Sequence, residues 1–312
     1  MNFTLSTLAV LLVTAGGAIA GPATPSRSLV VVPPSDVAGA RVIEAPGQIP
    51  VQASTDRIAP APREAGSDKA QLAFDGCMAY RQEVTLPSCT YGDRSSTESV
   101  LLFGDSRAMQ YFPAILPLAR RHHWKLTGLV RADCVASLVD YERYCDAWKE
   151  NMLERIEKRV RPDLVVLGSA TKSLYRVNRN GATLSREASQ PYLVRGMVRL
   201  IRRLEATGAK VVVMRDQSTA PFTPSDCVAR NIHHLRRCAF VPASRRERAF
   251  ELTAARRTGI KAIDAQPMFC SRRLCPAVIG DAIVNKDNYH LTATYSRTLA
   301  RWMSGQLPAF GG

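Results

Sequence analysis

Short apolar runs alternate along the chain with longer segments in which apolar residues recur every three or four positions. One such run, Leu164-Val165-Val166-Leu167, follows Pro162-Asp163 directly. Runs of this kind are typical of strands buried on both faces of a parallel sheet. We expect strands at 99–103, 124–130, 164–168, 210–214 and 260–264. The alternation predicts the α/β class, as a three-layer α/β/α sandwich with a parallel sheet of about five strands.

The longer segments predict helices between the strands. They cover 106–121, 144–161, 191–206, 244–257 and 293–306. Gly208 and Gly259 follow two of them, as is common where a helix ends in a left-handed residue. Thr292 stands where the N-cap of the last helix is expected. This helix would pack the C-terminal part of the chain onto the sheet.

The first part of the chain shows no such pattern. Residues 1–20 are apolar and end in Ala18-Ile19-Ala20, the small-x-small form that precedes a signal-peptidase cut. We therefore expect a signal peptide at 1–20; alternatively this stretch, which has no Lys or Arg, is an uncleaved anchor helix. Residues 21–73 are rich in Pro, Ala, Ser and Val and predict a linker. The folded domain should span 74–312.

Eight cysteines fall into four close sequential pairs, which supports export. The pairs are Cys77 with Cys89, Cys134 with Cys145, Cys227 with Cys238, and Cys270 with Cys275. Nearest-neighbour disulfides close the shortest loops and form in an oxidising compartment such as the periplasm or the cell exterior. The competing interpretation is metal ligation. No Cys-x-x-Cys motif or Cys/His quartet supports it, so we expect no metal.

The net charge of +15 raises the question of nucleic acid as a partner. The sequence has no zinc finger, basic zipper, RRM signature or aromatic-interleaved basic patch, so we expect no nucleic acid. The positive charge either lies on Arg-rich helix faces that are simply solvated, or attracts the protein to an anionic envelope polymer or lipid surface.

Two short motifs carry the candidate chemistry. Gly104-Asp105-Ser106 follows the first predicted strand and opens a helix, at the edge of the sheet where ligand sites form. Asp287 precedes His290 by three residues, just before the last helix. An aspartate so placed can bond Nδ1 of the imidazole and leave Nε2 to take a proton from a serine. Alone, the first motif could be a turn with a helix N-cap, and the second could be a loop with a solvated histidine; neither would then have a catalytic role. Their conjunction predicts a serine nucleophile.

The chain resembles the SGNH hydrolases, whose fold is flavodoxin-like, and most closely the extracytoplasmic SGNH domain fused to membrane acyltransferase-3 proteins. The similarity covers about residues 58–307 and includes LLFGDSRAMQYFPAI at 101–115 and DNYHLTATYSRTLA at 287–300. The resemblance implies that Ser106 is the nucleophile, His290 the general base and Asp287 its orienting partner. It also implies acyl transfer to or from cell-surface carbohydrate without a cofactor.

The chain departs from this family at three places, one of which is Tyr111, where a tryptophan is common. Arg107 stands where a histidine is usual, and either holds an anionic group of the substrate or faces solvent. No asparagine comes directly after Leu167, so we expect the oxyanion donors to be the Ser106 N–H with Gly168 or Ser169.

The resemblance predicts an O-acyltransferase or an esterase acting on an acyl ester donor and a carbohydrate acceptor. Relatives receive the acyl group from a membrane domain, so this chain would need a membrane acyltransferase partner, or would work alone as an esterase. The alternative from another class is a non-catalytic envelope-polymer-binding protein that keeps the fold.

Overall fold

A computed structural model gives the structure of the protein and describes residues 29–170, 176–242 and 249–311. Its centre is a seven-stranded sheet in the order β11-β10-β7-β5-β6-β3, with β4 paired to β6 as well. The strands are β3 (Met78–Ala79), β4 (Thr90–Gly92), β5 (Ser99–Gly104), β6 (Lys125–Arg131), β7 (Leu164–Gly168), β10 (Lys210–Met214) and β11 (Lys261–Ile263). Only β4 runs antiparallel to its neighbour in this sheet.

The five predicted strands are confirmed as β5, β6, β7, β10 and β11, all parallel. The short strands β3 and β4 were not predicted. β5 pairs with β6 on one side and with β7 on the other, so the chain leaves β5 in one direction along the sheet and later returns past it. The residues after β5 therefore lie at the topological switch point, where open α/β sheets bind ligands.

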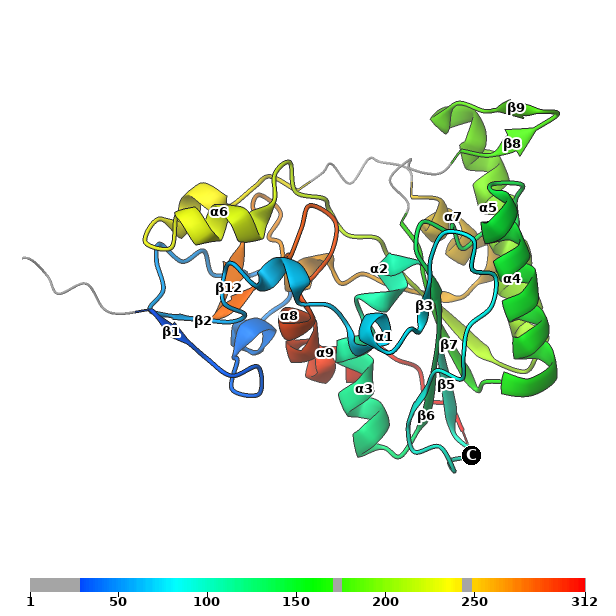
Figure 1. Ribbon diagram of the computed structural model, residues 1–312, viewed down its shortest axis with the longest axis horizontal. Coiled ribbons are helices and arrows are strands. Elements are labelled where there is room, and N and C mark those ends of the chain that lie inside the picture. Colours follow the sequence, from blue (N-terminus) through cyan, green and yellow to red (C-terminus); the bar gives the residue numbers. More distant parts are fainter. Residues whose placement is uncertain (1–28, 171–175, 243–248, 312) are drawn as a thin grey trace, which may run out of the picture.

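Helices cover both faces of the sheet (Figure 1). They are α1 (Gln71–Phe74), α2 (Ser106–Met109), α3 (Phe112–Arg121), α4 (Arg143–Arg155), α5 (Arg186–Glu205), α6 (Pro224–Arg230), α7 (Phe250–Thr258), α8 (Ala293–Thr298) and α9 (Ala300–Ser304). The remaining short strands form three pairs, which are β1 (Val30–Val31) with β2 (Arg57–Ile58), β8 (Asn178–Arg179) with β9 (Ala182–Thr183), and β12 (Val278–Ile279) with β13 (Ala282–Ile283). A π-helical turn at Ile156–Val160 extends α4.

Several helix boundaries differ from the predicted ones. The helix expected at 106–121 is broken into α2 and α3, because Pro113 has no N–H to donate to the Met109 carbonyl. α5 begins five residues before the expected start, where Ser185 caps it by accepting the Ala188 N–H. The first residues of the helix expected at 244–257 lie outside the described part of the chain. The helix expected at 293–306 is divided into α8 and α9, and Thr292 is confirmed as the N-cap of α8.

Alternate residues of β5 enter two separate cores. Val100 and Leu102 face the core under α3, α8 and α9, whereas Leu101 and Phe103 face the core under α4, α5 and α7. In the second core, Trp148 stacks on Phe103 with ring centroids 5.4 Å apart. The all-apolar β5 is therefore explained by burial on both faces.

The predicted linker is wrong for residues 29–73. Val37, Ile58 and Ala59 are fully buried in this segment. The Ala59 N–H donates to the Asp281 carbonyl, and the Ile283 N–H donates to the Ala59 carbonyl. The segment lies along α6, β12 and α8 in Figure 1. Isolated apolar side chains and backbone hydrogen bonds hold it on the domain, while the signal peptide expected at 1–20 and residues 21–28 lie outside the described residues.

The four predicted disulfides are confirmed. They join Cys77 to Cys89, Cys134 to Cys145, Cys227 to Cys238, and Cys270 to Cys275. Disulfides in this number are typical of proteins that fold in an oxidising compartment, so an extracytoplasmic location follows. In the part of the chain that the structure describes, no helix combines the length and apolarity needed to cross a bilayer.

Candidate active site

Ser106 opens α2 directly after β5, at a turn that two glycines make possible. Gly104 has a φ of +141°, and a Cβ built there would lie 1.8 Å from the Gly168 carbonyl oxygen. A Cβ on Gly168 would in turn lie 2.8 Å from Cα of Ala108. Since β5, β7 and the start of α2 approach this closely, the backbone can bring Ser106 to the carboxyl edge of the sheet.

The His290 imidazole lies between Ser106 and Asp287. Its Nε2 is 2.9 Å from the Ser106 Oγ, and its Nδ1 is 2.9 Å and 3.0 Å from the two carboxylate oxygens of Asp287. The structure thus brings together the three residues of the two sequence motifs, although Ser106 and His290 are 184 positions apart. With Nδ1–H donating to the carboxylate, Nε2 is left as the acceptor for the serine proton.

The loop that carries the imidazole is organised around Asp287. Its Oδ1 accepts the N–H groups of Tyr289 and His290, both at 2.7 Å, and its Oδ2 lies 2.9 Å from Nζ of Lys286. Burial alone would raise the pKa of Asp287, but the hydrogen bond and charge of His290 and those of Lys286 hold it well below its usual value. Asp287 is therefore a carboxylate at any pH near neutrality.

Arg107 is not available to hold a substrate, which corrects both interpretations of its role. Its side chain is only 3% exposed, and its Nε lies 3.2 Å from Oδ1 of Asp216. One terminal nitrogen of the guanidinium donates to the Tyr289 carbonyl. Arg107 thus ties α2 to the loop after β10 and to the residue before His290.

Two glutamines that the sequence did not reveal support the same loop. Gln110 Oε1 accepts the Leu291 N–H at 3.2 Å, and Gln110 Nε2 donates to Gln217 Oε1 at 3.0 Å. Gln217 Nε2 donates in turn to the Tyr289 carbonyl at 3.3 Å. Both glutamines are buried. A polar residue four positions after Ser106, within an apolar helix, was the only available signal for Gln110, and Gln217 had none.

Asp105 fixes the backbone on the other side of Ser106. It is fully buried; Oδ1 accepts the Arg107 N–H at 2.8 Å, and Oδ2 accepts the Ala170 N–H at 2.8 Å. The Ser169 hydroxyl also donates to Asp105 Oδ2, at 3.3 Å, and accepts the Ala136 N–H. The Ser169 side chain, expected as an oxyanion donor, is thus engaged in the interior. Gly168 packs under α2, where its carbonyl accepts the Asp105 N–H.

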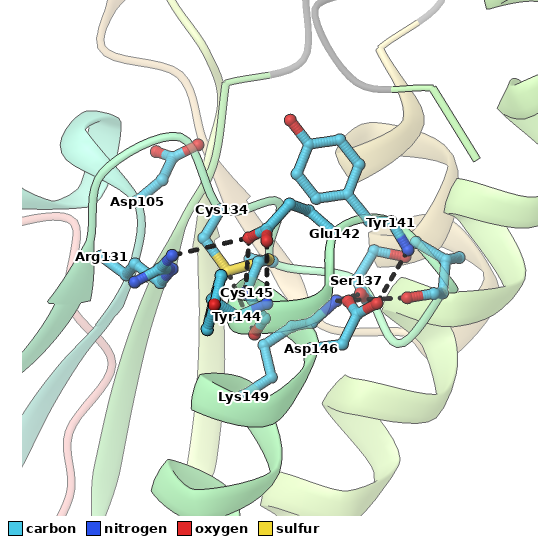
Figure 2. The surroundings of a disulfide bond; sticks show 12 residues. Asp105, Arg131, Cys134, Ser137, Tyr141, Glu142, Tyr144, Cys145, Asp146 and Lys149 are labelled. Carbon is cyan, nitrogen blue, oxygen red and sulfur yellow. Dashed lines mark hydrogen bonds and ion pairs between the residues drawn. A yellow bond between two sulfur atoms is a disulfide. The ribbon is translucent and has the colours of Figure 1, made fainter. Parts of the chain in front are cut away.

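A stapled loop adjoins Asp105 between β6 and α4. Figure 2 shows the Cys134–Cys145 disulfide in this loop, together with Arg131 and the buried Lys149. Lys149 Nζ donates to the Ser137 carbonyl at 2.7 Å and pairs with Asp146 at 2.9 Å. The disulfide and the buried cation hold the loop that presents the Ala136 N–H to Ser169.

A family model for the SGNH domain that is fused to AT3 domains matches residues 72–304. The chain belongs to this SGNH family. The match includes β5, α2 and the 287–290 loop, and therefore the whole hydrogen-bonded set of Ser106, His290 and Asp287. A search of curated protein sequences finds no match for the SGNH chain.

The chain is similar to solved structures at low sequence identity. The lipopolysaccharide acetyltransferase periplasmic domain of Salmonella ser. Paratyphi A superposes with a TM-score of 0.52 and 14% identity, over 68% of this chain and 84% of that chain. Est24, a carbohydrate acetylesterase from Sinorhizobium meliloti, superposes with a TM-score of 0.43 and 13% identity, over 67% of this chain and 97% of that chain.

Proposed function

We propose that the chain is a serine acyl-transfer enzyme that acts on acyl groups of cell-envelope carbohydrate, as an O-acyltransferase or an esterase. The observation that carries the proposal is the continuous hydrogen-bonded path from Ser106 through His290 to Asp287. In this arrangement a neutral imidazole can remove the serine proton, and a carboxylate stabilises the imidazolium that results.

The reaction would run in two balanced steps. The Ser106 oxygen attacks the acyl carbonyl and gives its proton to Nε2 of His290, which returns it to the departing group of the acyl donor. The acyl group is then an ester on Ser106. A sugar hydroxyl or water next gives its proton to His290 and attacks this ester, and Ser106 takes the proton back as it leaves. Transfer to a sugar hydroxyl would make the protein a transferase, and transfer to water would make it an esterase.

The developing oxyanion needs hydrogen-bond donors. As the first residue of α2, Ser106 has a backbone N–H without an intrahelical acceptor, so it is our candidate donor. Gly168 and the Ser169 side chain are less suited than the sequence indicated, because they contact α2 and Asp105.

Three observations support a carbohydrate substrate. The family is one of domains fused to AT3 domains, and the Salmonella domain of similar fold is named a lipopolysaccharide acetyltransferase. Tyr289, next to His290, keeps 44% of its surface exposed. Its apolar ring and polar hydroxyl suit it to contact a sugar. We further propose that the chain is periplasmic or secreted, with an N-terminal segment that is either cleaved or a membrane tether. A membrane acyltransferase partner would supply the acyl group to a transferase form.

Labelling with a fluorophosphonate, followed by mass spectrometry, tests the nucleophile. We expect one adduct on Ser106 in the oxidised protein, because His290 activates the Ser106 hydroxyl. Ser106→Ala lacks this hydroxyl and should give no adduct. Ser35→Ala, at an exposed position outside the site, should label like the unchanged protein. The absence of an adduct on folded protein would refute the enzyme and favour the non-catalytic envelope-binding protein.

A further inference from the structure

A small pocket lies beside His290. Its lining residues are Lys69, Ala70, Met109, Gln110, Pro113, Lys286, His290, Leu291 and Ala293. Two of these side chains are lysines and none is a carboxylate. The pocket itself has room for no more than a water molecule, so an anionic group of a molecule whose reacting atoms are at Ser106 would contact Lys69 at the exposed rim.

Lys69 is brought to the pocket by its neighbour Asp68. The Asp68 carbonyl accepts the Ala293 N–H at 3.1 Å, and its Oδ2 accepts the Thr294 N–H at 2.9 Å. Two hydrogen bonds to the start of α8 therefore hold the backbone at Lys69, and Ala70 beside it is buried. Lys69 belongs to the segment before residue 72, where the family match begins. The wall it forms is thus a feature of this chain beyond the matched domain.

The charges around the pocket are not balanced at Lys69. Lys286 Nζ pairs with Asp287 at 2.9 Å and is 11% exposed, so its charge is largely offset. The Asp68 carboxylate is bonded to the start of α8, and Arg297 also acts on it. Lys69 is exposed, and within the described residues its side chain has no hydrogen bond or ion pair. Its ammonium group is available to a ligand.

We infer, on the basis of the proposed function, that the carbohydrate substrate carries an anionic group, a carboxylate or a phosphate, close to the acylated hydroxyl. Lys69 is the specificity-determining contact, whereas the charge of Lys286, which also lines the pocket, is largely offset by Asp287. The apolar side chains of Met109 and Pro113 would lower the local dielectric and strengthen the attraction. A neutral sugar ester would fit the same site but lack this contact.

Hydrolysis of matched esters tests the inference. The probes are an acetylated methyl glucuronoside, the corresponding acetylated glucoside, and a phosphate-bearing form of the latter, which separates carboxylate from phosphate recognition. We expect kcat/KM for at least one anionic probe to exceed that for the neutral probe. Lys69→Glu should lower the ratio of the anionic to the neutral kcat/KM about fivefold or more, mainly through the KM of the anionic probe. Lys69→Arg should retain the preference.

Lys158→Glu is the matched control, because it makes the same charge change at a residue that pairs with Glu154 and does not line the pocket. Binding of the same probes to Ser106→Ala gives a readout that does not depend on turnover. Equal binding of anionic and neutral probes, or a preference that survives Lys69→Glu, would overturn the inference. Preferential binding without Ser106-dependent hydrolysis would uphold the anion site and refute the proposed enzyme.

Discussion

Arg107 shows how a single buried side chain supports the candidate site. Its guanidinium pairs with the buried Asp216 and donates to the Tyr289 carbonyl, one residue before His290. The ion pair has almost no contact with water, since both side chains are at most 3% exposed. Removing one partner of such a pair leaves an uncompensated charge in the interior.

We therefore expect Arg107→Met to lower the free energy of unfolding by about 3 kcal/mol, because the buried carboxylate of Asp216 loses the positive charge of Arg107. Urea denaturation measures this change. Arg121→Met, at the exposed end of α3, should change stability by less than about 0.5 kcal/mol. An equally small effect of Arg107→Met would show that the ion pair is not maintained in solution.

The sequence predicted the residues that lie on local motifs and missed those defined by long-range contacts. Ser106, Asp287 and His290 each follow or precede a recognisable strand or helix boundary, so their positions at the sheet edge could be inferred. The burial of Arg107 depends on Asp216, which is 109 positions later in the chain. No local pattern specifies such a pair, and a charged residue in the first turn of a helix ordinarily faces solvent.

At the scale of elements, the segment at residues 29–70 differs most from its prediction. Its strands are two residues long, and its apolar side chains are spaced irregularly. Periodicity detects only elements that present one face repeatedly, so a segment that buries single side chains in tertiary contacts resembles a linker. The central strands β5, β7 and β10, by contrast, contain continuous apolar runs and were predictable from their composition.

The Ile58→Ala substitution tests whether the segment at residues 29–70 is packed on the domain or is a linker. Ile58 is fully buried with Val228 and Ile283, so its truncation should cost about 3 kcal/mol through lost burial and the cavity that remains. Val30→Ala, in the partner strand but 50% exposed, should have an effect below about 0.5 kcal/mol. The denaturation midpoints of the two variants give the comparison, and a linker would leave both unchanged.

At the scale of the whole molecule, one buried carboxyl group links stability to pH. Glu251, in α7, is fully buried, and its Oε1 accepts the Asp216 N–H at 3.4 Å. Burial, together with the charge of Asp216, raises the pKa of Glu251 to about 8. The folded protein therefore holds a proton that the unfolded chain releases near its ordinary pKa of about 4.3.

Because the folded state binds more protons in this range, stability should fall as pH rises from about 4.3 to about 8, and level off above it. Between pH 5 and pH 8 this group should cost the unchanged protein on the order of 3 kcal/mol of stability, and Glu251→Gln, which keeps the shape without the charge, should not show that loss. Thermal unfolding at both pH values measures the difference. If the stability of Glu251→Gln changed with pH as it does in the unchanged protein, the proton held by the folded state would belong to a group other than Glu251.

The distance along the chain between Ser106 and His290 has a consequence for synthesis. A ribosome adds Ser106 in the first half of the chain and His290 only 184 residues later. Throughout that interval the nascent protein has a serine hydroxyl with no imidazole to activate it, and an unassisted hydroxyl is a weak nucleophile. Reactivity would thus appear only when the last helices dock, so premature release from the ribosome yields fragments that are chemically inert.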